Sequence, residues 1–399
     1  MHAKRVTKWT IWIFVLALGL AACGKKEPAT QGAEGEFIVK IGSAAPLTGP
    51  QAQLGKDNDN GARLAIDEIN EAGVMLGGKK VKFVLVSEDD QADPKTATIV
   101  AQKLADAQVK GVIGHLNSGA SIPASKVYFD AGIPQISPSA TAIAYTAQGF
   151  KTAFRVMTND RQQGKVLGEY AVKKLGAKKI AIIDDRTAYG QGLADEVEAA
   201  AKASGAAMVA REYTSDKSTD FNAILTVIKG KQPDVVFFAG MYPQGIPMVK
   251  QMRSLGLTAR FMGADGVQTA DFLSLAGADA EGTIASSPGL PLESMPGGKA
   301  FKEKFNAKYG VIQNYAPYAY DATQTMVEAM KKADSAEPTK YLEELPRIQH
   351  AGVTGNISFD ERGDIRGGAI TLYKVKNGKW EVLETISGDA STTPPAQKK

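Results

Sequence analysis

Apolar positions along this chain follow two alternating patterns. Short runs rich in valine, isoleucine and phenylalanine are typical of buried strands, and longer stretches with an apolar residue every three or four positions are typical of helices. Residues 59–70, for example, place Ala62, Ala65 and Ile69 on one helical face. Because predicted strands and helices alternate along the chain, the pattern predicts parallel sheets with helices on both faces.

Two such runs of alternation follow one another in the sequence. The first predicts strands at 37–43, 81–86, 109–114 and 134–137, with helices at 59–70, 94–107 and 120–129. The second predicts helices at 164–175, 192–204, 221–228 and 245–255, with strands at 179–183, 207–213, 234–239 and 260–263. We therefore expect an α/β fold with two doubly wound parallel-sheet lobes.

The last third of the chain departs from this alternation. Helices are predicted at 298–308 and 317–332, and two adjacent strands at 369–376 and 380–387. Asn377-Gly378 between these strands is a strong signal for a hairpin with a type I′ turn. A terminal hairpin can return to complete one lobe, so we expect several chain crossings to join the lobes as a hinge.

Each expected lobe combines two separate parts of the sequence. The N-terminal lobe is expected to contain residues 37–158 and 287–366, and the C-terminal lobe residues 159–286 and 367–390. Ligands of open α/β sheets bind at the carboxyl ends of the strands. The cleft between the lobes is therefore the expected binding site.

The first residues have the features of an exported lipoprotein. Lys4, Arg5 and Lys8 precede about a dozen apolar residues, too few to span a bilayer. Residues 1–22 are therefore predicted to be a signal peptide. Leu-Ala-Ala-Cys23 resembles a bacterial lipobox, which makes Cys23 the expected lipid attachment site. The alternative is an ordinary signal peptide with a chance cysteine at this position.

The segments next to the two ends lack apolar periodicity. Residues 23–36 contain proline and several glycines and are predicted to be a flexible tether between the lipid and the fold. Residues 391–399 are predicted to be a disordered tail.

Composition and charge narrow the class of function. Hydrophobic residues make up 44% of the chain and charged residues 23%, as in globular proteins. The formal net charge of +4 falls to about +1 once the three leader cations are removed. Such a balance, with scattered charge, argues against a nucleic-acid-binding protein, which needs a basic face or stripe.

Motifs for catalysis or cofactor binding are not apparent. His115 and His350 have no second ligand at metal-binding spacing, and His115 is expected to be a hydrogen-bonded structural residue. Nucleophile-elbow, P-loop and zinc-protease motifs are missing. Gly190-Gln-Gly192 is separated from the preceding strand, so it indicates a helix start and not a dinucleotide fingerprint. We expect neither an enzyme nor a bound cofactor or metal.

Several short segments together resemble one protein family. The sequence is similar to the periplasmic binding proteins of branched-chain amino acid ABC transporters, from about residue 37 to residue 387. The segments are Pro46-Leu-Thr-Gly-Pro50, Gly61-Ala-Arg-Leu-Ala-Ile66, Asp93-Pro94-Lys95, Val112-Ile-Gly-His-Leu116, Ile136-Ser-Pro-Ser-Ala-Thr141, Tyr189-Gly-Gln-Gly192 and Phe261-Met-Gly-Ala-Asp-Gly266. The family has a two-lobed α/β fold that closes about a hinge.

The resemblance implies a role for particular residues in holding an amino acid. Ser118, Ser139 and Thr141 correspond to positions that bind the ligand carboxylate, in keeping with Ser118 lying near the start of a predicted helix. The plain alternative for Ser118 is a helix N-cap. Tyr189 corresponds to a tyrosine that closes over the ligand. Asp265 corresponds to the acidic residue that faces the ligand ammonium, with a turn aspartate as the alternative.

Some positions depart from the family pattern. Well-known members have glutamate in place of Asp265, tyrosine in place of Met241 and an aromatic residue in place of Leu54. Met241 and Leu54 are therefore expected to line an apolar pocket of altered shape. A pair of disulfide cysteines falls on Ala92 and Asn117, so that bridge is missing here.

The resemblance also implies partners and location. The expected protein is a lipid-anchored, monomeric periplasmic component that captures a branched-chain or similar amino acid and delivers it to an ABC permease in the inner membrane. One alternative keeps the fold but binds an amide, an aromatic acid or another amino acid. The other alternative is a sensing module that reports ligand binding to a signalling partner.

Overall fold

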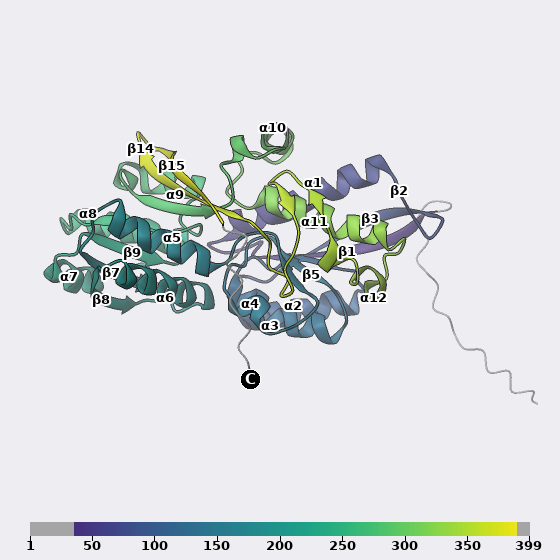
Figure 1. Ribbon diagram of the computed structural model, residues 1–399, viewed down its shortest axis with the longest axis horizontal. Coiled ribbons are helices and arrows are strands. Elements are labelled where there is room, and N and C mark those ends of the chain that lie inside the picture. Colours follow the sequence, from purple (N-terminus) through teal and green to yellow (C-terminus); the bar gives the residue numbers. More distant parts are fainter. Residues whose placement is uncertain (1–35, 389–399) are drawn as a thin grey trace, which may run out of the picture.

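The computed structural model describes residues 36–388 and folds them into two α/β lobes that lie side by side (Figure 1). The predicted signal peptide, Cys23, nearly all of the predicted tether and the predicted 391–399 tail lie outside the described residues. Among the residues that are described, no helix is both long and apolar enough to cross a membrane. The α/β architecture with two lobes is as predicted, and the exact lobe boundaries stay a prediction.

The first lobe is built on a mixed sheet of six described strands. Their spatial order is β2 (Val74–Leu76), β3 (Lys79–Asp89), β1 (Phe37–Ala45), β4 (Val112–Gly114), β5 (Gln135–Ser137) and β6 (Ala153–Arg155). All neighbouring pairs are parallel except β2 with β3. The carboxyl ends of β1, β3, β4 and β5 therefore meet at one edge.

Helices cover both faces of this sheet. Helices α1 (Ala52–Ala72) and α11 (Ala316–Lys332) pack together on one face, and α2 (Pro94–Asp106) and α3 (Ser118–Asp130) pack on the other (Figure 1). The lobe also contains α4 (Ala144–Ala147), α10 (Gly298–Tyr309), α12 (Pro338–Tyr341) and a small sheet of β12 (His350–Ala351) and β13 (Asn356–Ile357). As predicted, Ala62, Ala65 and Ile69 of α1 are buried in the core.

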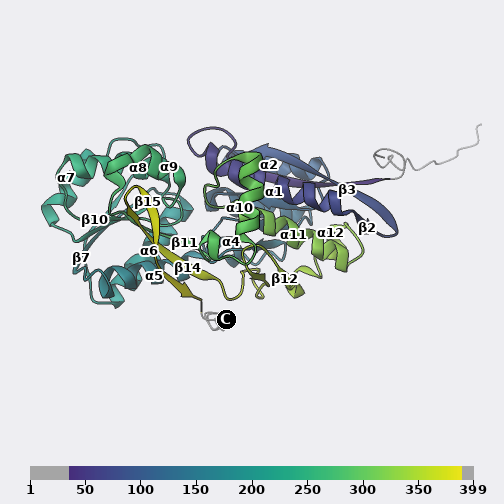
Figure 2. The ribbon, with the colours of Figure 1, turned by 90° about the horizontal axis from the view of Figure 1, so that it is seen from above.

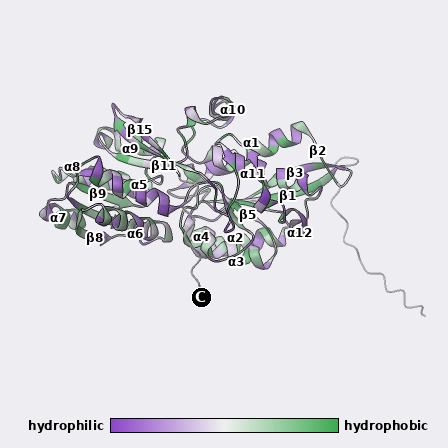
Figure 3. Ribbon diagram, in the orientation of Figure 1, coloured by the Kyte–Doolittle hydropathy of each residue, from purple (hydrophilic) through white to green (hydrophobic). Residues whose placement is uncertain are grey.

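The second lobe has a sheet of seven strands in the described part of the chain. Their order is β15 (Lys379–Ser387), β14 (Ala369–Lys376), β11 (Ile284–Pro288), β10 (Arg260–Met262), β9 (Val235–Ala239), β7 (Lys179–Asp184) and β8 (Ala207–Tyr213). Strands β7 to β11 are parallel, β14 is antiparallel to β11, and β15 is antiparallel to β14. The strands are largely apolar, as Figure 3 shows.

The helices of the second lobe also lie on two sides of their sheet. Helices α5 (Asp160–Lys173) and α6 (Ala188–Ala203) pack together on one face (Figure 2). Helices α7 (Asn222–Lys231), α8 (Tyr242–Ser254) and α9 (Ala270–Ala276) cover the other face. Three 3₁₀ turns, Gly277–Ala280, Leu292–Ser294 and Leu345–Arg347, complete the elements.

Two glycines set the separation of α5 and α6. A Cβ atom on Gly164 would lie 2.5 Å from the Cβ of Glu196, and one on Gly168 would lie 2.7 Å from the Cβ of Ala200. Both distances are far below van der Waals contact, so only glycine permits this approach. The close packing brings the N-terminal turns of α5 and α6 toward the same region between the lobes.

The chain passes between the two sheets three times. It leaves the first sheet after β6, returns after β11 and crosses again before β14. At the first and last crossings, Arg155 Nε donates to the Asp364 carboxylate at 2.6 Å, and Gly363 accepts from the Arg155 backbone N–H at 2.9 Å. Burial opposes ionisation of Asp364, but the Arg155 charge and three side-chain hydrogen bonds hold its pKa below the usual value.

The hairpin prediction is confirmed in detail. Asn377 and Gly378 have φ angles of 53° and 70°, both in the region that a type I′ turn requires. The first strand of the hairpin pairs with β11 of the second sheet.

Other element predictions needed correction at their limits. Helix α1 begins at Ala52, seven residues before the predicted start at residue 59, and strand 109–114 is reduced to Val112–Gly114. Strands β2, β6 and β11 are additions that the apolar pattern did not indicate.

Candidate functional site

The loops at the carboxyl ends of β3, β4 and β5 form one wall of a cavity between the lobes. Helix α3 begins at Ser118, directly after β4, and Asn117 occupies its N-cap position without a side-chain cap. The backbone N–H groups of the first helical turn and the helix dipole favour an anion at this point. Ser118 is not an N-cap; its Oγ accepts a hydrogen bond from the Ala142 N–H at 3.1 Å.

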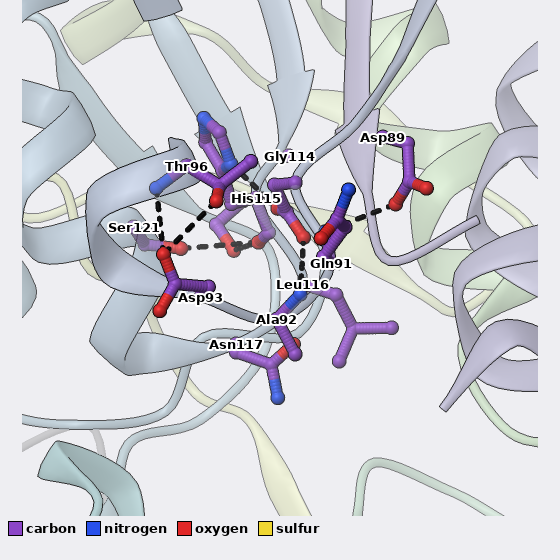
Figure 4. A network of polar contacts seen from close by, with 12 residues as sticks. Asp89, Gln91, Ala92, Asp93, Thr96, Gly114, His115, Leu116, Asn117 and Ser121 are labelled. Carbon is purple, nitrogen blue, oxygen red and sulfur yellow. Dashed lines mark hydrogen bonds and ion pairs between the residues drawn. The ribbon is translucent and has the colours of Figure 1, made fainter. Parts of the chain in front are cut away.

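A buried polar network supports this wall (Figure 4). In the His115 ring, Nδ1 lies 2.7 Å from a carboxylate oxygen of Asp90, and Nε2 lies 3.0 Å from the hydroxyl oxygen of Tyr128. The hydroxyl of Ser121 donates to the His115 carbonyl oxygen at 3.1 Å. His115 is therefore a hydrogen-bonded structural residue, as expected, and it fixes the segment that leads to Ser118.

The neighbouring loop after β3 lies against the same segment. Gln91 and Ala92 have positive φ angles of 55° and 57°, and their backbone N–H groups donate to the carboxylates of Asp89 and Asp90. Figure 4 shows Ala92 beside Asn117. Both residues line the cavity.

The opposite wall centres on Asp265, which follows β10. Its carboxylate accepts hydrogen bonds from Gln163 Nε2 at 2.9 Å, from the Tyr189 hydroxyl at 2.9 Å and from the Tyr315 hydroxyl at 2.8 Å. Only 2% of Asp265 is exposed. Burial raises the pKa of its carboxyl, and the three hydrogen bonds oppose this shift without cancelling it.

Residues from both lobes enclose the cavity, whose volume is about 370 Å³. The first lobe contributes, among others, Gln51, Leu116, Asn117, Ser118, Ser139 and Tyr315. The second lobe contributes, among others, Asp185, Arg186, Tyr189, Asp216, Met241 and Asp265. A volume near the lower end of the range for small-molecule sites suits a ligand with few heavy atoms.

The two lobes also contact each other directly. The hydroxyl of Tyr242, the first residue of α8, donates to the Pro50 carbonyl oxygen at 2.9 Å. Pro50 lies just before α1 in the first lobe, so this hydrogen bond exists only when the lobes are close together.

The structure brings together most of the residues singled out from the sequence. Ser118, Ser139, Tyr189, Met241 and Asp265 line the cavity. Thr141 is fully buried and is not a lining residue. Leu54 is fully buried in the hydrophobic core and does not line the cavity either.

Two residues next to Asp265 were not found from the sequence. Gln163 comes from the first turns of α5, and Tyr315 comes from the segment before α11. Tyr315 lies 50 positions from Asp265 in the chain, and no local pattern marks it as a partner.

A larger cavity of about 630 Å³ lies along the hinge, between α5, residues 360–368 and the end of β15. It contains none of the residues singled out from the sequence, and charges of both signs line it, such as Lys165, Glu169 and Asp360. No group of three or more potential metal ligands occurs among residues 36–388.

A cavity that two hinged α/β lobes enclose defines a two-lobed binding protein. The chain belongs to the periplasmic binding protein family, whose pattern matches residues 38–379. Membership in this family makes it an extracytoplasmic binding protein and not an enzyme.

Individual relatives cover nearly the whole chain. An amino acid binding protein of Pseudomonas aeruginosa is 39% identical over 349 residues, which are 86% of this chain and 92% of the relative. A leucine-, isoleucine-, valine-, threonine- and alanine-binding protein of the same organism is 36% identical over 84% of this chain and 89% of its own. The branched-chain amino acid transporter substrate-binding protein LivJ of Streptococcus pneumoniae, solved in complex with isoleucine, superposes with a TM-score of 0.80 at 31% identity. This superposition covers 88% of this chain and all of LivJ.

Proposed function

We propose that this protein captures a branched-chain or similar aliphatic amino acid between its lobes as the substrate-binding component of an ABC importer. The observation that carries the proposal is the pairing of two opposite features across one cavity. A buried carboxylate, Asp265, lies on the second lobe, and an uncapped helix N-terminus at Ser118 lies on the first.

The N-terminus of α3 would hold the ligand carboxylate. Ser118 and Asn117 line the cavity where α3 begins. A hydroxyl has one proton to donate and two lone pairs to accept. The hydrogen bond from the Ala142 N–H uses a lone pair of Ser118 Oγ and not its proton. The hydroxyl proton can therefore be donated to an anion. We assign the neighbouring Ser139 to the same end of the ligand; Thr141, which does not line the cavity, would act from behind it.

Asp265 would hold the ligand ammonium. A carboxylate can accept about four hydrogen bonds, and Asp265 accepts from Gln163, Tyr189 and Tyr315. A place for one further donor therefore remains. A charge-assisted hydrogen bond between ammonium and carboxylate offsets the loss of hydration on entry to the cavity.

Apolar residues would contact the ligand side chain. Met241 and Leu116 line the cavity, and methionine adapts its shape to different aliphatic groups. Leu54 lies behind this surface in the core and would act through packing.

Binding of both ligand charges would favour the closed form. The carboxylate site belongs to one lobe and Asp265 to the other, so only a closed molecule satisfies both ends. A ligand that binds the closed form more tightly than the open form shifts the population toward closure. The closed shape would then be recognised by the membrane permease.

The family places the protein outside the cytoplasm. Its finer location is part of the proposal: lipid attached to Cys23 would anchor the chain to a membrane of the cell envelope. We propose that it acts as a monomer and carries no cofactor. A sensing module with the same fold is the second candidate, and no observation among the described residues specifically favours it.

Titration calorimetry with L-leucine, L-isoleucine and L-valine tests the proposal. We expect dissociation constants near the micromolar range, which corresponds to about −8 kcal/mol. A thermal-shift screen with the other amino acids, benzoate and simple amides covers the alternative ligands. Binding of such a compound without any response to the three aliphatic amino acids would refute the assignment of ligand class.

A further inference from the structure

A second buried acid, Asp160, lies beside the proposed ammonium site. It is the first residue of α5 and is 1% exposed. Its backbone N–H donates to the Thr141 carbonyl oxygen at 2.9 Å. Neither of its carboxyl oxygens has a hydrogen-bond partner among the described residues.

The surroundings of Asp160 are rich in acceptors and poor in donors. Gln163, one helical turn further along α5, gives its Nε2 to Asp265, and its Oε1 has no partner within residues 36–388. The Thr141 hydroxyl is a donor beside Asp160 and favours its ionised form, but this effect is smaller than that of burial. A buried acceptor without a donor costs free energy, so this cluster calls for a proton or a cation.

The charged groups that face Asp160 come from three elements. Asp265 follows β10, Arg155 ends β6 and Glu196 lies on α6. The guanidinium of Arg155 is already engaged by Asp364, Thr146 and the Ala140 carbonyl oxygen. No hydrogen bond joins it to the Asp160 carboxyl.

Gln163, one helical turn from Asp160 on α5, donates to the Asp265 carboxylate, so the two buried acids belong to one site. Two interacting buried carboxyls do not both ionise without a counter-charge. Burial, followed by the negative charge of Asp265, raises the pKa of Asp160 to about 8. At neutral pH one proton is therefore held by the pair in the absence of a cation.

We propose that the ligand ammonium displaces a proton held by the Asp160–Asp265 pair, so that amino acid capture releases a proton to solvent. This inference rests on the proposed function and adds a regulating group to that site. The charge balances: the O–H bond of one carboxyl breaks and its proton is taken up by a buffer base, while the ammonium brings one positive charge into the site. Asp160 acts through Asp265 and does not need to touch the ligand, so it is a positioning residue.

The exchange makes affinity depend on pH in a definite direction. Protons compete with the ammonium, so the dissociation constant rises as pH falls. The slope is at most about tenfold per pH unit, the limit for one proton. At about pH 8 the pair is half deprotonated, and the dependence levels off above that pH.

Calorimetry in two buffers of different ionisation enthalpy, phosphate and Tris, measures the protons released per bound ligand. With L-leucine at pH 7 we expect the wild-type protein to release a large fraction of one proton. Asp160→Asn keeps the shape of the side chain but cannot hold the proton, and it is expected to release far fewer. Asp130→Asn, an exposed change beside Lys126 on α3, serves as a control and is expected to match the wild type.

Two results overturn the proposal: no proton release by the wild type, or equal release by wild type and Asp160→Asn. The wild-type dissociation constant between pH 5.5 and 8.5 gives a test that needs no variant, and a flat profile would also refute it. If leucine, isoleucine and valine all fail to bind, the proposed function is wrong and this inference falls with it. Binding without proton release removes the inference alone.

Discussion

The hydroxyl of Tyr315 donates a hydrogen bond to the carboxylate of Asp265 at 2.8 Å, across the boundary between the two lobes. Tyr315 precedes α11, which packs on α1 in the first lobe, and Asp265 follows a strand of the second sheet. The backbone around Tyr315 is fixed by Asp57 of α1, which accepts four N–H groups from residues 313–316 at 2.7–3.0 Å. The proposed ammonium site is therefore assembled from both lobes.

Replacing the acid at this junction should weaken binding strongly. Asp265→Asn keeps the shape but removes the charge that faces the ammonium, and a charged hydrogen bond contributes about 1.5–3 kcal/mol. We expect the dissociation constant for L-leucine in calorimetry to rise by at least about tenfold. An unchanged constant would reject the assignment of Asp265. Asp265→Glu, which restores the charge, should lose less affinity than Asp265→Asn.

The contribution of Tyr315 can be measured separately. Tyr315→Phe removes the hydrogen bond to Asp265 while leaving the ring in place. The bond is expected to contribute about 1 kcal/mol, or roughly a fivefold change in affinity. Calorimetry should show this loss with little change in melting temperature. A gain in affinity would mean that the hydroxyl competes with the ligand for Asp265.

A substitution at the N-terminus of α3, on the wall opposite Asp265, should also lower the affinity. Ser118→Ala removes a hydroxyl donor from the carboxylate site, and we expect affinity for L-leucine to fall by about tenfold, because hydrogen bonds to charged groups are worth about 1.5–3 kcal/mol. Ser125→Ala on the same helix is the matched control: the Ser125 hydroxyl does not line the cavity, donates to the Ile122 carbonyl oxygen and accepts from Gln148 Nε2. Equal effects of the two substitutions would show that Ser118 acts only through helix stability.

The contact between Tyr242 and Pro50 should favour closure. Tyr242→Phe removes a hydrogen bond that joins the lobes directly. Without it, the ligand-free protein should populate open forms more, and small-angle scattering should give a larger radius of gyration. Because less of the population is competent to close, affinity should fall by a few-fold. If scattering and affinity both match the wild type, this hydrogen bond has no part in closure.

The buried acids also make the stability of the ligand-free protein depend on pH. The pKa of Asp160 is raised to about 8 by burial and by Asp265, above its usual value of 3.8. The folded state therefore binds more protons than the unfolded state, and stability falls as pH rises toward the folded pKa. His350, whose pKa is lowered by burial from 6.5, acts in the opposite sense, but only at lower pH.

The window from pH 6.5 to 8.5 brackets the raised pKa of Asp160, and Asp160→Asn separates its contribution from that of other buried acids such as Asp265. We expect the melting temperature of the ligand-free protein to decline across this window, and Asp160→Asn to reduce the decline. A melting temperature that rises with pH in this window would contradict the raised pKa.

The sequence was sufficient for the fold because its regular elements carry an apolar pattern. The turn at Asn377-Gly378 could also be identified, since type I′ geometry requires residues that tolerate positive φ. The first turns of α1 were missed because Asp57 and Asn58 are polar yet buried. They are buried to bond distant segments, such as 313–316 and Ser139, and such contacts leave no local pattern.

The site could be predicted only in part, for a related reason. Ser118, Tyr189 and Asp265 lie in short segments next to strand ends or helix starts, which the resemblance could mark. Gln163 and Tyr315 reach Asp265 through tertiary packing alone. Asp160 differs again: its two oxygens matter because no group in the described part of the chain hydrogen-bonds to them, which only a structure can reveal.

A crystal structure of the protein with bound L-leucine tests the central claim most directly. The account expects the amino nitrogen within about 3.2 Å of a carboxylate oxygen of Asp265. The ligand carboxylate should lie at the N-terminus of α3, within reach of Ser118. Leucine bound in the reverse orientation, or in the hinge cavity beside α5, would contradict it.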